Sequence, residues 1–159
     1  MPAPTIYCID TSSIITWFVE TYPPAIFPGL RDRIEDLIAA GRLRSPKAVL
    51  DEIRPGDDCH KWAKDNHAKL FVEESVAVQR IVRQLMVTHH NPAKPLKGIN
   101  GADPFVIAMV KDGGADWIVV CNEHPGSQEN RKIPFVCLQE GVRCINFQGL
   151  MLAEGWQFR

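Results

Sequence analysis

The chain has 159 residues, of which 45% are hydrophobic and 23% charged, and its formal net charge at pH 7 is −1. These values predict one globular domain over residues 1–159 and give no general argument for a nucleic-acid partner. No apolar run is long enough to cross a bilayer, and we expect neither a signal peptide nor a membrane partner. The five cysteines have no regular spacing, so we expect free thiols and a cytoplasmic protein.

Short apolar strands alternate along the chain with segments of helical periodicity. Strands are predicted at residues 5–9, 43–45, 117–121, 135–137 and 143–145. Helices are predicted at residues 14–19, 30–38, 47–53, 57–70, 75–87, 104–112 and 148–154. This alternation is typical of an α/β fold with a mostly parallel central sheet flanked by helices. Residues 89–98 hold two prolines and predict a loop, with His89 and His90 at the surface.

Helix-start signals fall beside three of the predicted helices. Asp10 and Asp103 are candidate N-caps, and Ser45 is a third, placed before Pro46 at a first helical position. Asp103 also precedes a proline, Pro104, which is tolerated at the start of a helix. Capping alone would account for each of these polar residues.

Four acidic residues occur where a ligand site of a parallel sheet is expected. Ligands bind beyond the carboxyl ends of strands, and Asp10 and Glu123 each follow a predicted strand. Asp103 begins a helix, and Glu52 falls at the flank of the apolar face of its helix, roughly 110° from the centre. Each acid alone has an ordinary explanation as a cap or surface charge, and their joint order carries the prediction.

With these acids in place, the sequence resembles the PIN-domain family of nucleases. The matching segments are IDTSS at 9–13, AVLDEI at 48–53, GADPFVIA at 101–108 and VVCNE at 119–123. It is most similar to the VapC-type toxins of prokaryotic toxin–antitoxin pairs and to a poorly characterised PIN-like branch, which the segments 132–137 and 154–156 also resemble. The resemblance implies a three-layer PIN-like fold and a metal-dependent endoribonuclease that is neutralised by an antitoxin.

The resemblance also implies the site residues. Asp10, Glu52, Asp103 and Glu123 match the family's catalytic acids, and we expect Asp10, Asp103 and Glu123 to bind metal. Ser12 matches the small hydroxyl position beside the first acid. The sequence departs from the family at the last acid, where Asp is usual, and Asn122 is a candidate to share the role of Glu123.

The chemistry of phosphodiester cleavage agrees with this set of residues. Oxygen ligands favour Mg²⁺ or Mn²⁺, which supply charge neutralisation and an activated water. RNA is the expected substrate, and loop cations are the candidates for its phosphates: Arg54, Lys94, Lys97 and Lys132. Trp17 and Trp62 are candidates for base stacking, with core packing favoured for Trp17.

Other interpretations stay open at this point. A catalytically silent PIN-like module that binds RNA or a partner is the main alternative, and the Glu at position 123 favours it weakly. A phosphatase of another α/β fold would need an acid at position 12, where the sequence has Ser12. The cysteines and histidines have no zinc-ligand spacing, and Cys121 is expected to act as a small apolar residue. We also expect a homodimer, with residues 57–88 as a clip for RNA or antitoxin.

Overall fold

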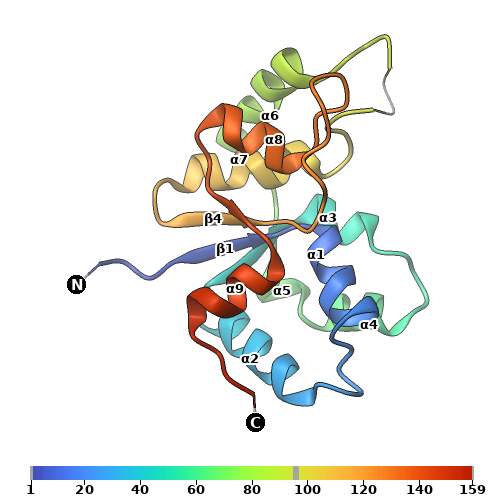
Figure 1. Ribbon diagram of the computed structural model, residues 1–159, viewed down its shortest axis with the longest axis vertical. Coiled ribbons are helices and arrows are strands. Elements are labelled where there is room, and N and C mark those ends of the chain that lie inside the picture. Colours follow the sequence, from blue (N-terminus) through green and yellow to red (C-terminus); the bar gives the residue numbers. More distant parts are fainter. Residues whose placement is uncertain (1, 95–96, 159) are drawn as a thin grey trace.

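A computed structural model describes residues 2–94 and 97–158. Its strands form one parallel sheet in the order β3-β2-β1-β4-β5. The strands are β1 (Ile6–Ile9), β2 (Leu43–Pro46), β3 (Phe71–Val72), β4 (Trp117–Val120) and β5 (Cys144–Ile145). All carboxyl ends therefore meet at one edge, on the right of Figure 1, as expected for parallel strands joined by helical crossovers.

Helices cover both faces of this sheet, which gives the three layers of Figure 1. One layer contains α6 (Val76–His89), α7 (Asp103–Gly113) and α8 (Ile133–Glu140). The other contains α1 (Thr11–Ile15), the π-helical turn η1 (Thr16–Glu20), α2 (Pro28–Ala39), α4 (Asp58–Asp65), α5 (His67–Leu70) and α9 (Phe147–Glu154). The short helix α3 (Lys47–Glu52) follows β2 at the carboxyl edge.

The core is apolar on both faces of the sheet because its central strands are covered twice. Cys8, Ile9, Val119 and Val120 are fully buried in β1 and β4. The hydrophobic side chains of α7 pack over them, which explains why that helix is buried along most of its length. In the parts of the chain that the structure describes, no helix is both long and apolar enough to cross a bilayer.

Trp17 and Trp62 both belong to this core, in the layer of α1, α2 and α4. Their side chains are 0% and 2% exposed, and their rings meet edge to face with centroids 5.0 Å apart. The prediction of core packing for Trp17 is confirmed. Trp62 is too deeply buried to stack on a base, so that candidate role was wrong.

One predicted strand is wrong, and one strand of the sheet was not predicted. Residues 135–137 are not a strand but part of α8, which has a proline in its first turn and ends at Gly141 in the left-handed conformation (φ 69°). An apolar run of three residues does not distinguish a strand from a buried helix. The short edge strand β3 was not predicted, because its two residues give too little pattern.

Two of the three predicted caps are also shifted by one residue. Pro46 ends β2 and Lys47 begins α3, while the Ser45 hydroxyl donates to the Ile9 carbonyl at 2.7 Å instead of capping the helix. Asp103 is the first residue of α7 and Ala102 is its N-cap. Asp10, by contrast, caps α1 as predicted, since its side chain accepts the Ser12 amide.

Candidate metal centre

Asp10 and Glu123 meet because their strands are neighbours in the sheet. β1 and β4 pair in parallel with Ile9 opposite Val120, so the residues that follow both strands leave the sheet at the same point. One carboxylate oxygen each of Asp10 and Glu123 and the sulfur of Cys121 all lie within 4.8 Å of one another. Asp10 is only 1% exposed, whereas Glu123 is half-buried.

The hydrogen bonds of this pair leave two oxygens unused. Asp10 Oδ2 accepts the Ser12 hydroxyl at 2.9 Å and the Ser12 amide at 3.3 Å. Asp10 Oδ1 and Glu123 Oε2 are buried without a hydrogen-bond partner among the described residues. A buried carboxylate oxygen without a donor is costly, and a bound cation would satisfy it. These atoms therefore fit a hard metal ion.

Glu52 reaches the same edge of the sheet from α3, as its position on the helix predicts. Its Oε2 accepts the Thr11 hydroxyl at 2.9 Å, and its Oε1 accepts the Ala102 amide at 2.8 Å. Each carboxylate oxygen can accept a further bond, so Glu52 can still hold a water. The carboxylate links the start of α1 to the start of α7.

Gly101 makes the approach of Glu52 to α7 possible. Its backbone is left-handed (φ 55°), and a Cβ at this position would collide with Glu52 Oε1. Two residues later, Asp103 is 9% exposed and its Oδ2 accepts the Asn100 amide at 3.3 Å. The turn before α7 thus sets the position of two of the four acids.

The pKa values show that the carboxylates act on one another. The pKa of Asp103 is raised to about 8, mainly by burial and also by the charges of Glu123, Asp10 and Glu52. Burial also raises the pKa of Glu123, to which Asp10 and Glu52 add, while Lys132 lowers it. The pKa of Asp10 is raised mainly by burial, against the hydrogen bonds from Ser12. The four acids are therefore close enough to repel one another electrostatically, as a cation site requires.

Cys121 belongs to this cluster, which corrects the expectation of a merely apolar residue. Its sulfur lies 3.8 Å from Asp10 Oδ2 and 3.6 Å from the Ser12 hydroxyl, and it accepts the Glu123 amide at 3.4 Å. The sequence did hold a signal for this role, because Cys121 directly follows β4 and stands two residues before Glu123.

Ser12 and Asn122 join the ends of β1 and β4. The Ser12 hydroxyl donates to Asp10 and accepts the Asn122 amide at 3.0 Å. The Asn122 side-chain carbonyl accepts Ser13 Oγ at 2.5 Å and the Phe147 amide at 3.0 Å. Asn122 thus holds the end of β4 against α1 and α9, and its side-chain oxygen is used for this purpose.

The four candidate RNA-binding cations lie on three segments, and all but the half-buried Lys132 are exposed. Arg54 is exposed just after α3. Lys94 contacts Glu129 at 3.5 Å, and Lys97 is exposed in the same loop, whose residues 95 and 96 lie outside the described residues. Lys132 caps α8 and is the member whose charge acts on Glu123. Of the four, Lys132 is the one linked electrostatically to the acids.

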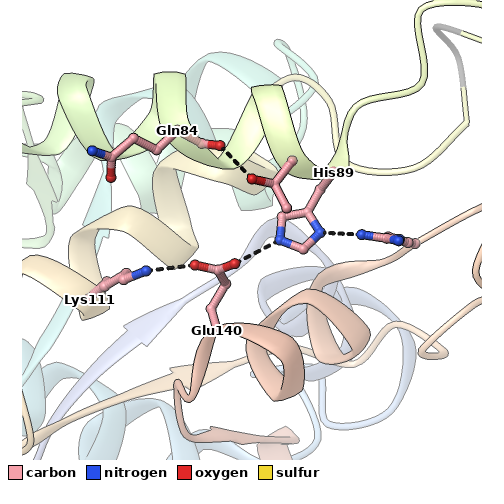
Figure 2. A network of polar contacts seen from close by, with 6 residues as sticks. Gln84, His89, Lys111 and Glu140 are labelled. Carbon is pink, nitrogen blue, oxygen red and sulfur yellow. Dashed lines mark hydrogen bonds and ion pairs between the residues drawn. The ribbon is translucent and has the colours of Figure 1, made fainter.

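The prediction that His89 lies in a surface loop is wrong. His89 is the last residue of α6, and it is buried (6% exposed). Figure 2 shows its ring against Glu140 of α8, which also contacts Lys111 of α7. His89 Nε2 lies 2.9 Å from Glu140 Oε2, and Lys111 Nζ lies 2.6 Å from Oε1. Arg131 donates to His89 Nδ1 at 2.8 Å, so the ring joins α6 to the segment that precedes Lys132.

The fold and the acidic cluster define a PIN-like α/β protein with a candidate metal centre at the carboxyl edge of its sheet. Residues 7–158 match the model of a family described as a domain of unknown function, DUF4411, and the chain belongs to that family. A search of curated proteins found no match.

Among solved structures, the chain is similar to one chain of VapBC2 from Rickettsia felis, a complex solved bound to a DNA fragment from its promoter. The two share 12% sequence identity with a TM-score of 0.52, over 90% of this chain and 99% of the other. This likeness concerns the fold and confirms the predicted PIN-like architecture.

Proposed function

We propose that this protein is a metal-dependent endoribonuclease that hydrolyses RNA phosphodiester bonds, and that it acts as the toxin of a toxin–antitoxin pair. The observation that carries the proposal is the pairing of Asp10 and Glu123 at the ends of two adjacent strands, each with a buried carboxylate oxygen that no described residue satisfies. The charges of Glu52 and Asp10 also raise the pKa of Asp103. Buried carboxylate oxygens without donors cost stability unless a cation binds them. The similarity in fold to a VapBC2 chain supports the toxin part of the proposal.

In this proposal, Asp10, Asp103 and Glu123 hold the ion. A divalent cation of the Mg²⁺ or Mn²⁺ type would neutralise charge on the phosphoryl oxygens and favour ionisation of the attacking water. Glu52 orients that water, and its hydrogen bonds from Thr11 and Ala102 keep its carboxylate in place. Ser12 holds one oxygen of Asp10, which leaves the other for the ion.

The RNA backbone would approach across the loops that surround the acids. Lys132 is the first candidate to bind a phosphate because its charge already acts on Glu123. Further phosphates along the RNA would be bound by Arg54, Lys97 and Lys94. These contacts would not depend on the base sequence. The half-buried state of Glu123 leaves the cluster open on this side.

The direct test is cleavage of single-stranded RNA by the purified protein in Mn²⁺ or Mg²⁺, beside the same reactions in EDTA. We expect cleavage only with the metal, and at least about a 100-fold loss of rate in Asp10→Asn, since a lost ligand removes several kcal/mol of transition-state stabilisation. Asp116→Asn is the matched control, because Asp116 is exposed at the opposite end of β4. Cleavage that persists in EDTA or in Asp10→Asn would contradict the proposal.

The silent-module alternative makes the opposite prediction for the same protein. A module that only binds RNA or a partner should show no Mn²⁺-dependent rise in melting temperature and no cleavage. Removal of charge at Asp10 should then leave its RNA affinity unchanged. This pair of results would replace the nuclease proposal.

A partner protein and a homodimer belong to the toxin proposal. A surface hollow beside α2 carries exposed Ile26, Phe27 and Phe158, and an exposed apolar patch of this kind suits a protein interface.

Induced expression in a bacterial host should arrest growth for the wild type and not for Asp10→Asn. The mass of the purified protein in solution, measured by light scattering, should be twice that of one chain. A monomer that still cleaves RNA would contradict the homodimer and leave the nuclease proposal unaffected.

A further inference from the structure

The sulfur of Cys121 lies among oxygen ligands, which is an unusual composition for a site expected to bind Mg²⁺. Cys121 is 3% exposed, and its sulfur is grouped with carboxylate oxygens of Asp10 and Glu123 within 4.8 Å. Its 3.8 Å separation from Asp10 Oδ2 is close to the roughly 3.5 Å that separates a sulfur and an oxygen on one tetrahedral zinc ion. Without metal the thiol donates a weak hydrogen bond to this oxygen, and the two atoms are close enough for one ion to bind both.

A second observation points to a ligand at this place. Asp10 is 1% exposed, and its Oδ1 has no hydrogen-bond partner among the residues that the structure describes. The Oε2 atom of Glu123 is also buried and also lacks a hydrogen-bond partner among these residues. The cluster thus offers two unused oxygens beside the thiol, and all three donors come from the carboxyl ends of two adjacent strands.

We propose that Cys121 is a metal ligand together with Asp10 and Glu123, so that the centre prefers a transition ion of the Zn²⁺ type to Mg²⁺. This inference rests on the metal centre of the proposed function and adds the class of ion that the centre selects. Hard ions such as Mg²⁺ bind oxygen and reject sulfur, whereas Zn²⁺ and Co²⁺ accept thiolate, carboxylate and water together.

The thiol serves as a thiolate when it binds, and its proton passes to solvent. With Cys121 in place of Asp103 as the third direct ligand, the set would be two carboxylates and one sulfur, with one position left for water or a substrate oxygen, as is usual in catalytic zinc sites. The amide of Glu123, which donates to the sulfur at 3.4 Å, would stabilise its negative charge.

Co²⁺ is the probe, because a cobalt–thiolate bond gives a charge-transfer absorption band in the near ultraviolet that oxygen ligands do not give. Metal-free protein is titrated with Co²⁺ under anaerobic conditions, for the wild type, Cys121→Ser and Cys59→Ser. Cys59→Ser is the matched control, because Cys59 is equally buried (2% exposed) but lies in α4. Thermal unfolding of each variant checks that it is folded.

We expect the charge-transfer band in the wild type and in Cys59→Ser, and its loss in Cys121→Ser. Competition between ions should show at least a tenfold loss of Zn²⁺ affinity in Cys121→Ser, with Mn²⁺ affinity changed less than threefold. A saturating Co²⁺ complex without the band, or a band that persists in Cys121→Ser, would overturn the inference and leave the nuclease proposal intact. Absence of any Co²⁺ binding would overturn the inference as well, and the Mn²⁺ cleavage assay then decides the proposed function separately.

Discussion

At the scale of single residues, the site brings together carboxylates whose burial and mutual repulsion oppose the metal-free fold. Asp10, Asp103 and Glu123 are buried or half-buried, and burial is the largest cause of the raised pKa of each. Two like charges about 4 Å apart repel by roughly 4 kcal/mol at an effective dielectric constant near 20. A set of neighbouring carboxylates with raised pKa values that costs stability is typical of a functional site.

Substitution of Asp103 should therefore separate stability from activity. We expect Asp103→Asn to lose Mn²⁺-dependent cleavage. In EDTA at pH 8, its free energy of unfolding should exceed that of the wild type by on the order of 1–3 kcal/mol, so it should unfold at a higher temperature. The reason is that the amide keeps the shape of the side chain but removes a buried charge. The measurement is thermal unfolding of the metal-free proteins.

Asp112→Asn is the matched control for this prediction, since Asp112 is exposed near the end of the same helix. Its unfolding free energy should change by less than about 0.5 kcal/mol. A metal-free Asp103→Asn protein that is less stable than the wild type would show that the carboxylate has a structural role instead.

The acids and their neighbours Ser12 and Asn122 could be predicted from the sequence, whereas the contacts around them could not. Asp10 and Glu123 follow strands, and parallel pairing brings such positions together in any sheet of this type. The contacts of Cys121 with Asp10 and of Asn122 with Ser13 depend on side-chain direction at a strand end. Periodicity gives no information on such directions outside regular elements.

At the scale of elements, the turn before α7 is held by a single carboxylate. Glu52, the last residue of α3, accepts the Ala102 amide, and the left-handed Gly101 allows it to come close. The position of Asp103 therefore depends on a contact between two helices that lie 50 residues apart in the chain. We expect this contact to matter for both stability and activity.

Gly101→Ala should test that contact. The added methyl group meets Glu52 Oε1, so we expect a loss of about 2–4 kcal/mol in the free energy of unfolding and a fall in cleavage rate. Gly155→Ala is the control, because Gly155 has a similar backbone (φ 66°) with no atom near the added group. Urea unfolding should give a loss of about 1–2 kcal/mol for the control. Equal losses in both variants would mean that Glu52 has room to move.

The ion-pair network of Figure 2 makes a prediction about pH. Hydrogen bonds from Lys111 and His89 hold the pKa of Glu140 below its ordinary value of 4.5. The folded state thus binds this proton less readily than the unfolded chain. The stabilisation is fully present above pH 4.5 and is lost as the pH falls through the lower, folded-state pKa.

Glu140→Gln should cost about 1–3 kcal/mol at pH 7, because buried His89 loses its charged partner. The difference from the wild type should shrink below about pH 4, where the unfolded carboxylate is largely protonated in any case. Urea unfolding at pH 7 and pH 3.5 measures both values. Glu129→Gln, which removes an exposed partner of Lys94, should change little, and a pH-independent cost for Glu140→Gln would refute the linkage.

Sequence patterns predicted the helices and strands that are long enough to show a period. The amphipathic helix at 75–87 corresponds to α6, and the strand at 117–121 corresponds to β4. The segment 135–137 was wrong because its three apolar residues fit a strand and the buried face of α8 equally well. Tertiary packing, which the sequence pattern does not contain, decides such cases.

At the scale of the whole molecule, parallel topology gathers residues that are far apart in the sequence. Asp10, Glu52, Asp103 and Glu123 come from four segments. Parallel pairing of β1 and β4 brings Asp10 and Glu123 to the carboxyl edge of the sheet, and Glu52 contacts the starts of α1 and α7. The architecture could be predicted from the alternation of strands and helices. The partner, the RNA and the preferred ion depend on surface shape and side-chain chemistry, which alternation does not encode.

The most direct measurement is calorimetric titration of Mn²⁺ into the metal-free protein. The account predicts saturable binding in the wild type and in Asp116→Asn, and no saturable binding in Asp10→Asn, which lacks the buried ligand at the centre of the cluster. Equal binding in Asp10→Asn, or none in the folded wild type, would contradict the claim that these acids form a metal centre.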